Sequence, residues 1–125
     1  MDLETIRRYC LEKAGTTEDF PFDEDTLVFR VMGKMFLLTS VSNPEFVNLK
    51  CDPERAIEYR ERYEAVQPGY HMSKKLWNSV YLNAGVPDPL FFGMIDQSYE
   101  LVAQSLKKAE REKLKRITSK PLKKK

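Results

Sequence analysis

Cysteine, histidine and tryptophan are scarce in this chain of 125 residues, which contains two, one and one of them respectively. Long apolar runs are also missing, because none approaches the roughly 20 residues that are needed to cross a bilayer. The start Met1-Asp2-Leu3-Glu4 lacks the basic and then apolar layout of an export signal. These absences predict a cytoplasmic protein that does not bind a membrane.

The residues that could hold a metal ion or form a covalent bond make no recognisable motif. Cys10 and Cys51 belong to no CxxC pair, and His71 is the only histidine, so neither a disulfide framework nor a zinc site is indicated. The five glycines are spread along the chain and form no phosphate-binding loop. We therefore expect two reduced, buried thiols, no metal ion and no cofactor.

Charge is distributed unevenly along the chain. Residues 107–125 hold ten Lys/Arg and two acidic residues, a net charge of +8. Residues 1–106 hold 11 basic and 17 acidic residues, a net charge of −6. The length and the ordinary composition, with 42% hydrophobic residues, predict one folded domain. We expect this domain to span residues 1–117 and a basic, disordered tail to follow at 118–125.

The chain is expected to begin with a helix and a connecting loop. Apolar residues recur at helical spacing in residues 2–14, and Gly15 provides a natural stop. The acidic stretch 16–25 that follows is typical of a loop. We expect Phe20 and Phe22 to pin this loop to the body of the domain.

A three-stranded meander is predicted next. Residues 26–41 alternate with a period of two on both sides of Gly33-Lys34, as a hairpin with a tight glycine turn requires. The alternation continues in residues 46–51, which gives a third strand. One face of the first strand is apolar and carries Leu27, Phe29 and Val31. The other face is partly apolar too, so a helix or a partner is expected to cover it.

The second half of the chain predicts two more helices and a further strand. Asp52-Pro53 can cap a helix that runs to about Glu64, and Asp88-Pro89 repeats this start for a long helix. Residues 67–69 break the chain, and residues 77–82 have the character of a strand. The inner face of the long helix is marked by Phe91, Ile95, Ser98 and Val102. The predicted fold class is therefore α+β, an antiparallel β-sheet packed by helices.

The segment from Pro68 to Val80 holds the densest cluster of residues able to bind a ligand. Lys74 and Lys75 could meet phosphate charge, Tyr70 and Trp77 could stack on bases, and Asn78 could read a base edge. The structural interpretation of the same residues is that Trp77 belongs to the core and that the two lysines are simply solvated. For Trp77 the structural interpretation is favoured.

Catalysis and metal binding have little support. His71 would have to serve any nucleophile, and no nucleophile motif surrounds it, so we expect no catalytic residue and no enzyme. His71 with Tyr70 or Asp96 is the remaining possibility for an active site. The acidic side chains between residues 18 and 25 could hold a hard cation, but a solvated acidic loop is the better interpretation: Glu18, Asp19, Asp23, Glu24 and Asp25.

Several motifs, in order along the chain, resemble those of the MmcQ/YjbR family of small bacterial proteins. They are Phe20-Pro21-Phe22, Gly33-Lys34-Met35-Phe36, Lys50-Cys51-Asp52-Pro53-Glu54, Pro68 to Asn78, and Ser98-Tyr99-Glu100-Leu101-Val102. The resemblance covers residues 1 to about 110. It implies an α+β fold similar to that of the bacterial frataxin CyaY, with N- and C-terminal helices. Members are described as DNA-binding on structural grounds, with no settled reaction.

Nucleic-acid binding is therefore the leading functional interpretation. The candidate contacts are Arg30, Lys34, Lys50, His71, Lys74, Lys75 and Asn78. The net charge of −6 on residues 1–106 opposes this interpretation, because phosphate contacts supply most non-specific affinity for DNA. The alternative is a module that binds a protein or a small molecule, with Tyr70, His71 and Trp77 lining a pocket.

Overall fold

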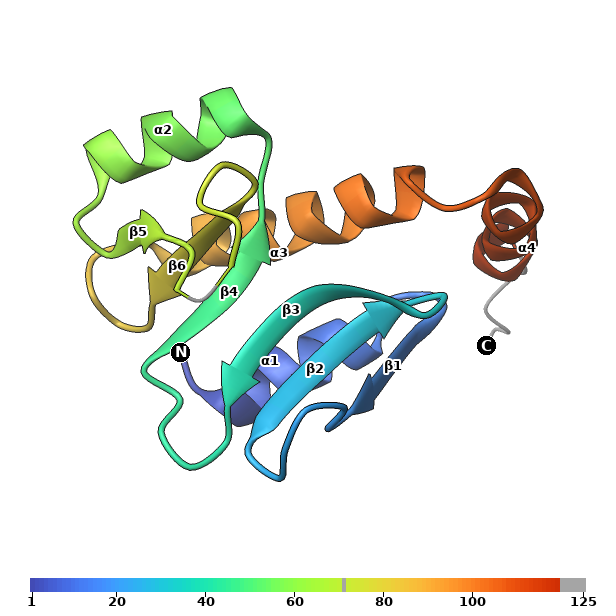
Figure 1. Ribbon diagram of the computed structural model, residues 1–125, viewed down its shortest axis with the longest axis horizontal. Coiled ribbons are helices and arrows are strands. Elements are labelled where there is room, and N and C mark those ends of the chain that lie inside the picture. The colour runs from blue at the N-terminus through green and yellow to red at the C-terminus, as the bar shows by residue number, and fades with distance from the viewer. Residues whose placement is uncertain (71, 120–125) are drawn as a thin grey trace.

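A six-stranded antiparallel sheet and four helices make up residues 1–70 and 72–119, the part of the chain that the computed structural model describes (Figure 1). The strands lie in the order β1-β2-β3-β4-β6-β5. Their bounds are Thr16–Asp19 (β1), Thr26–Val31 (β2), Lys34–Ser40 (β3), Phe46–Lys50 (β4), Val66–Pro68 (β5) and Trp77–Tyr81 (β6). The helices are Leu3–Leu11 (α1), Pro53–Arg62 (α2), Asp88–Gln104 (α3) and Lys108–Ser119 (α4). The predicted α+β class and the β2-β3-β4 meander are confirmed.

Two of the helices begin at aspartate caps. The Asp2 carboxylate accepts a hydrogen bond from the Thr5 N–H at the start of α1, and Asp52 accepts one from Arg55 at the start of α2. The cap predicted at Asp88 is wrong, because Pro87 occupies the N-cap position of α3 and makes no side-chain cap. Asp88 instead lies in the first turn, where its charge favours the helix dipole.

The β2–β3 hairpin turns at Met32-Gly33, one residue earlier than predicted. Val31 pairs with Lys34, and the two turn residues have φ angles of +49° and +90°. A two-residue turn with positive φ at both positions matches the twist of the strands that it joins, and glycine adopts it without strain. The turn therefore depends on Gly33.

A β-bulge in β3 brings an extra residue into the core. Phe29 pairs with Leu37, whereas Arg30 pairs with Met35, so Phe36 has no partner on β2. Phe36 and Leu37 consequently both join the main core, and the Phe36 ring meets Tyr99 of α3 edge-on at 5.4 Å between centroids. The bulge bends β3 at the point where α3 crosses it.

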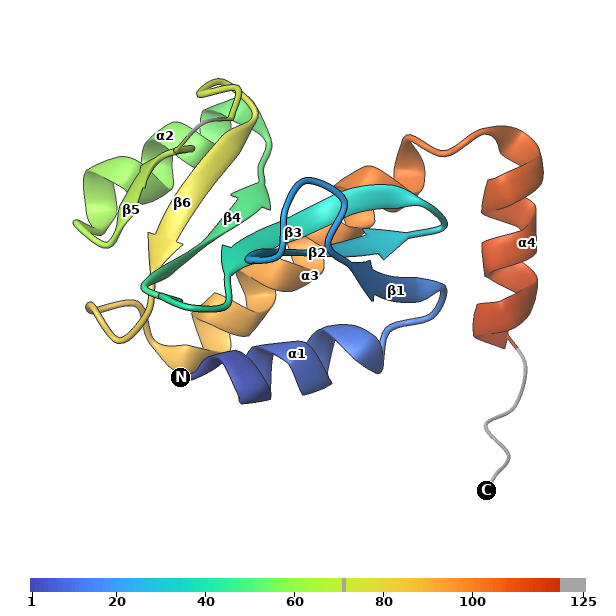
Figure 2. The same ribbon diagram turned by 60° about the horizontal axis from the view of Figure 1, so that its bottom comes forward.

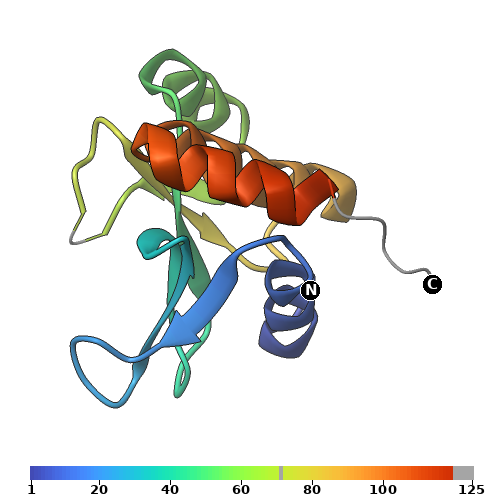
Figure 3. The same cartoon turned by 90° about the vertical axis from the view of Figure 1, so that its right-hand side faces the viewer.

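The two faces of the sheet are covered very differently. Leu27, Phe29 and Val31 lie on the face that packs against α1 and α3, as predicted, and the four inner-face residues predicted for α3 are all buried. Viewed along the sheet, α1 lies on one side, and the chain at residues 20–25, 69–70 and 72–73 lies on the other (Figure 3). On that second side the buried apolar residues form a small cluster of Val28, Leu38 and Trp77.

Four details of the sequence interpretation are corrected by the structure. Residues 16–19 and 66–68, expected as loop and chain break, are the two edge strands of the sheet. The aromatic rings at 20 and 22 are 48% and 62% exposed, so they do not pin their loop to the body. Helix α4 continues through Thr118 and Ser119, which were expected in the disordered tail. Residues 120–125, the rest of that tail, lie outside the described residues.

Helix α4 is attached to the rest of the domain by one apolar side chain. Leu114 is its buried residue, and a Cβ atom at Gly15 would lie 2.8 Å from the Leu114 Cδ1. The remaining side chains described in α4 are at least partly exposed, and five of them are basic. Within the described ranges, no helix combines the length and apolar character needed to cross a membrane.

One serine hydroxyl of α3 joins the two central strands where they stop pairing. The Ser98 hydroxyl donates to the Phe36 carbonyl at 2.5 Å and accepts from the Lys50 N–H at 2.9 Å. Direct pairing of β3 with β4 runs only from Leu37↔Leu49 to Thr39↔Val47. Ser98, which is fully buried, therefore satisfies the next pair of backbone groups in place of a ladder hydrogen bond.

We predict that Ser98→Ala lowers the free energy of unfolding by about 2–4 kcal/mol, because two buried backbone groups lose their partner. Urea denaturation measures the change. The control is Ser105→Ala, because Ser105 donates to the Val102 carbonyl from an exposed position at the end of the same helix. This control should change stability by no more than about 0.5 kcal/mol. Equal effects of the two substitutions would contradict the bridging role of Ser98.

Candidate ligand pocket on the open face of the sheet

The sheet face turned away from α1 and α3 contains a pocket of about 380 Å³, called here the open-face pocket. It lies over β3 and β4, between the loop that precedes β2 and the segment that precedes β6. Its lining residues are Phe22, Thr26, Met35, Leu38, Thr39, Ser40, Phe46, Asn48, Tyr70 and Met72. Its volume falls in the range of about 300–1,000 Å³ that is usual for sites of small molecules.

The chemistry of this lining is apolar and uncharged. Three aromatic rings and two methionines supply most of it, and methionine side chains adapt well to flat, polarizable ligands. Trp77 and Leu38 form the buried floor with Val28, and Met35 and Met72 pack against it. The polar side chains that line the pocket are those of Thr26, Thr39, Ser40, Tyr70 and Asn48, which offer four hydroxyls and one amide. These groups suit an uncharged ligand with few hydrogen-bonding atoms.

A closed set of hydrogen bonds fixes the Tyr70 backbone at the edge of the pocket. The Asn48 amide on β4 donates to the Tyr70 carbonyl at 3.2 Å, and the Ser79 hydroxyl on β6 donates to the Asn48 carbonyl oxygen at 2.5 Å. The Tyr70 N–H in turn donates to the Ser79 hydroxyl at 2.9 Å. Asn48 and Ser79 are buried, so these bonds are protected from water and hold the 69–72 segment over the sheet.

Gly69 fixes the chain where it leaves β5, and Arg60 fixes it where it approaches and enters β6. A Cβ atom at Gly69 would lie 2.8 Å from the Trp77 Cβ and 2.9 Å from its carbonyl oxygen, so only glycine allows this approach. Arg60 of α2 donates to the Asn78 side chain at 2.7 Å, to the Trp77 carbonyl at 3.3 Å, and to the Lys74 carbonyl. The pocket wall is therefore built before any ligand arrives.

The residues predicted to line a pocket are partly placed as expected. Tyr70 lines the pocket and is 59% exposed, with its ring edge-on to Phe46 at 5.9 Å between centroids. Trp77 is 8% exposed and lies beneath the lining, so the structural interpretation of this residue is confirmed. His71, which was predicted both as a pocket residue and as a nucleic-acid contact, lies outside the described residues.

The predicted nucleic-acid contacts do not form one surface. Lys74 and Lys75 are exposed beside the 69–72 segment, whereas Lys50 is half-buried at the end of β4. Arg30 is half-buried and donates to the Asp19 carboxylate at 3.1 Å, while Lys34 donates to the Ser105 carbonyl at 3.2 Å. The β2–β3 turn near these last two residues lies toward α4, away from the segment that precedes β6 (Figures 1 and 2).

Asn78 was expected to read a base edge, and the structure corrects this expectation. Its side chain is 2% exposed, its carbonyl oxygen accepts from Arg60, and its amide lies 3.5 Å from the Ala56 carbonyl. A buried amide with both ends engaged does not reach a ligand at the surface. Asn78 therefore joins β6 to α2.

The acidic loop is committed to hydrogen bonds within the chain. Backbone N–H groups of Thr26 and Asp25 lower the pKa of Asp23, and the Ser40 and Ser42 hydroxyls lower that of Asp25. Among residues 1–70 and 72–119, no three His, Cys, Asp or Glu side chains are grouped so as to hold a metal ion.

Both cysteines are free and buried, as predicted. Burial raises the pKa of the Cys10 thiol to about 12 and that of Cys51 to about 11. Thiols with such high pKa values carry almost no thiolate at neutral pH and are poor nucleophiles. Neither cysteine lines the open-face pocket.

The sequence interpretation missed most of the pocket lining. The outer face of β3 and β4 carries Met35, Phe46 and Asn48. The alternation in residues 46–51 does place Asn48 on the face away from Val47 and Leu49, which belong to the main core. The alternation could therefore have identified Asn48 as a residue of the outer face. The position of Phe22 in the pocket lining could not be foreseen, because it depends on the path of an irregular loop.

The chain is a small α+β domain whose antiparallel sheet packs its inner face against α1 and α3 and carries the open-face pocket on the other face. The chain matches the model of the YjbR family over residues 11–101 and belongs to this family. The uncharacterized protein YbdF of Escherichia coli is 35% identical over 112 residues, which cover 89% of this chain and 92% of YbdF. The uncharacterized protein YjbR of the same organism is 29% identical over 115 residues, covering 91% and 98% of the two chains.

Solved structures show the same fold. A crystal structure of a Deinococcus radiodurans protein of domain family DUF419 is 38% identical, with a TM-score of 0.83 over 90% of this chain and 87% of that one. A Pseudomonas syringae protein is 25% identical, with a TM-score of 0.69 over 82% of this chain and 99% of that one. The resemblance to the MmcQ/YjbR family noted in the sequence is confirmed.

Proposed function

We propose that the domain is a non-catalytic binding module that holds a small, uncharged, largely apolar molecule in the open-face pocket. The observation that carries this proposal is the pocket itself: about 380 Å³ of space, lined by aromatic and methionine side chains and, among residues 1–70 and 72–119, by no charged group. A pocket of this composition favours aromatic ligands, because ring faces and sulfur atoms make favourable contacts with other rings.

The absence of catalysis is part of the proposal. Acid–base chemistry needs a titratable group within hydrogen-bond reach of the substrate, and the described lining contributes only hydroxyls and one amide. The Asn48 amide already donates to Tyr70 and accepts from Ser79. The chemistry of these groups supports orientation of a ligand rather than its conversion.

A cytoplasmic location belongs to the same proposal. Its support is the state of the two cysteines, which are free thiols in the structure. Free thiols are typical of proteins in reducing compartments.

The single tryptophan of the chain makes this proposal directly testable. N-phenyl-1-naphthylamine is an uncharged aromatic probe that fluoresces in apolar sites and accepts energy from tryptophan. We predict that it binds the full-length protein and quenches Trp77, because Trp77 lies under the pocket lining. Phe22→Ser should weaken binding about fivefold to tenfold, because an aromatic contact is worth roughly 1 kcal/mol.

The matched control for this experiment is Phe20→Ser. Phe20 is also an exposed ring of the same loop, but it does not line the pocket. Its substitution should leave the Kd within twofold of the native value. The proposal is contradicted if the probe does not bind, or if the two serine variants weaken binding equally.

Nucleic-acid binding is a second proposal, favoured by the exposure of Lys74 and Lys75 on a segment whose backbone Arg60 holds in place. The net charge of −6 on residues 1–106 opposes it. If these lysines contact phosphates, the double variant Lys74→Gln/Lys75→Gln should bind mixed-sequence duplex DNA more weakly. The slope of log affinity against log salt should also fall by about 2 between about 50 and 200 mM salt.

Fluorescence anisotropy of labelled duplex DNA measures both quantities. An unchanged slope in the double variant would remove these two lysines from any DNA interface. It would leave the open-face pocket as the functional surface of the domain.

A further inference from the structure

A second hollow, of about 390 Å³, lies between the end of α1, the second half of α3 and helix α4. It is called here the α4 hollow. Helix α4 stands at the end of the molecule where α1 leads into β1 (Figures 1 and 2). The lining residues are Lys13, Ala14, Tyr99, Glu100, Ala103, Gln104, Arg111, Leu114, Lys115 and Thr118.

Three cationic side chains, two from α4 and one from the turn that follows α1, meet at this hollow. Arg111 and Lys115 are four residues apart on α4 and therefore share one face of the helix. Both are exposed, and neither forms an ion pair with another residue in the described part of the chain. Two unpaired cations side by side repel each other, and a bound anion would relieve this repulsion.

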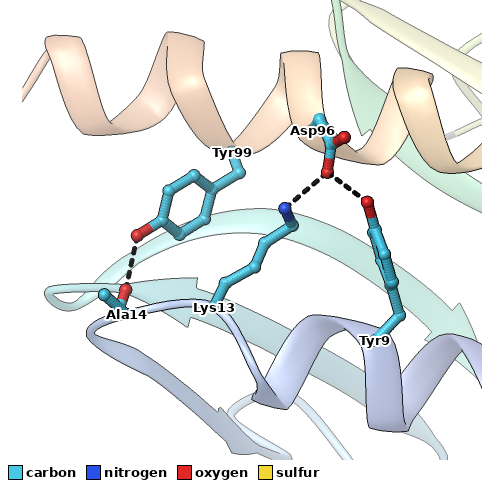
Figure 4. Close-up of polar contacts among 5 residues, drawn as sticks. All are labelled: Tyr9, Lys13, Ala14, Asp96 and Tyr99. Carbon is cyan, nitrogen blue, oxygen red and sulfur yellow. Dashed lines mark hydrogen bonds and ion pairs between the residues drawn. The ribbon is translucent and has the colours of Figure 1, made fainter. Parts of the chain in front are cut away.

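The third cation, Lys13, is held in position by its surroundings. Its ammonium group pairs with the Asp96 carboxylate, which also accepts a hydrogen bond from the Tyr9 hydroxyl at 2.7 Å (Figure 4). The same ammonium group lies 4.8 Å from the centroid of the Tyr9 ring and 5.2 Å from that of Tyr99. Asp96 offsets the charge of Lys13, and Glu100 also lines the hollow, so the excess of positive charge comes from Arg111 and Lys115.

The floor of the hollow is apolar and rigid. Ala14, Ala103 and Leu114 contribute small or buried surfaces, and the Tyr99 hydroxyl donates to the Ala14 carbonyl at 2.5 Å. The Gln104 amide adds an exposed hydrogen-bond donor at the rim. An anion with a compact body would therefore find cations on one side and a dry surface on the other.

We propose that the α4 hollow binds the phosphate group of a phosphorylated ligand, with Arg111 and Lys115 as its direct contacts and Lys13 supplying charge from the turn that follows α1. An arginine fork matches the oxygens of a phosphate, and a nearby ammonium adds a point charge. Binding would also add a link between α4, α1 and α3 to the one that the buried Leu114 side chain provides. The site is independent of the open-face pocket.

Inorganic pyrophosphate serves as the probe, titrated into the full-length protein by calorimetry at low salt. Arg111→Gln/Lys115→Gln should weaken its binding at least tenfold, because each hydrogen bond between charged partners contributes about 1.5–3 kcal/mol. The control Arg62→Gln/Lys113→Gln removes the same charge from exposed positions that do not line the hollow. It should change the Kd by less than threefold. Pyrophosphate should also slow hydrogen exchange in α4.

A short mixed-sequence DNA duplex separates the two sources of phosphate. If pyrophosphate displaces the duplex and Arg111→Gln/Lys115→Gln weakens both, the phosphate site stands and its source is the nucleic-acid backbone. If pyrophosphate binds and the duplex does not, the source is a small phosphorylated molecule. The proposal is overturned if pyrophosphate does not bind, or if both double variants weaken its binding equally.

Discussion

The hydroxyl of Ser98 is the constraint on which the arrangement of the domain depends. The bulge at Phe36 takes β3 away from β4, and the backbone groups left unpaired there would be buried without partners. Ser98 of α3 hydrogen-bonds to one backbone group on each strand, so one side chain joins the helix to both halves of the sheet where the direct β3–β4 pairing ends. A buried polar group of this kind specifies position strongly, because every alternative placement leaves an unsatisfied donor or acceptor.

Because α3 is fixed in this way, one face of the sheet is packed in the main core and the other is left partly open. With α3 held across β3 and β4, the inner face closes over the main core. The outer face carries a small cluster around Trp77, the loop before β2 and the segment before β6. On the outer face, the buried side chains of Asn48 and Ser79 hydrogen-bond to the backbone of Tyr70. They fix a neighbouring segment to the sheet, as Ser98 fixes α3 on the inner face. The uncovered space between that segment and the strands is the open-face pocket.

The parts of the fold that carry strong local signals could be predicted from the sequence. Alternation gave the meander, helical spacing gave the inner face of α3, and the Asp52-Pro53 start of α2 was correct. The short edge strands β1 and β5 were not predicted, because neither has a periodic pattern: β1 consists of four polar residues, and β5 is a triplet that ends in proline. The hydrogen bonds of Arg60 and the burial of Asn78 depend on contacts between α2 and β6. These two elements are separated along the chain, so local sequence patterns do not predict their contacts. The pocket lining combines three distant segments for the same reason.

The methionine methyl groups provide the most direct test of the central claim, that ligands bind on the open face of the sheet. Met35 and Met72 line the pocket, whereas Met94 and Met32 pack against the core on the other face. NMR spectra of protein with labelled methionine methyl groups, recorded during titration with N-phenyl-1-naphthylamine, follow both sets at once. The account predicts that the Met35 and Met72 signals shift while those of Met32 and Met94 stay in place. Shifts confined to Met32 or Met94, or no shifts at saturating probe, would contradict it.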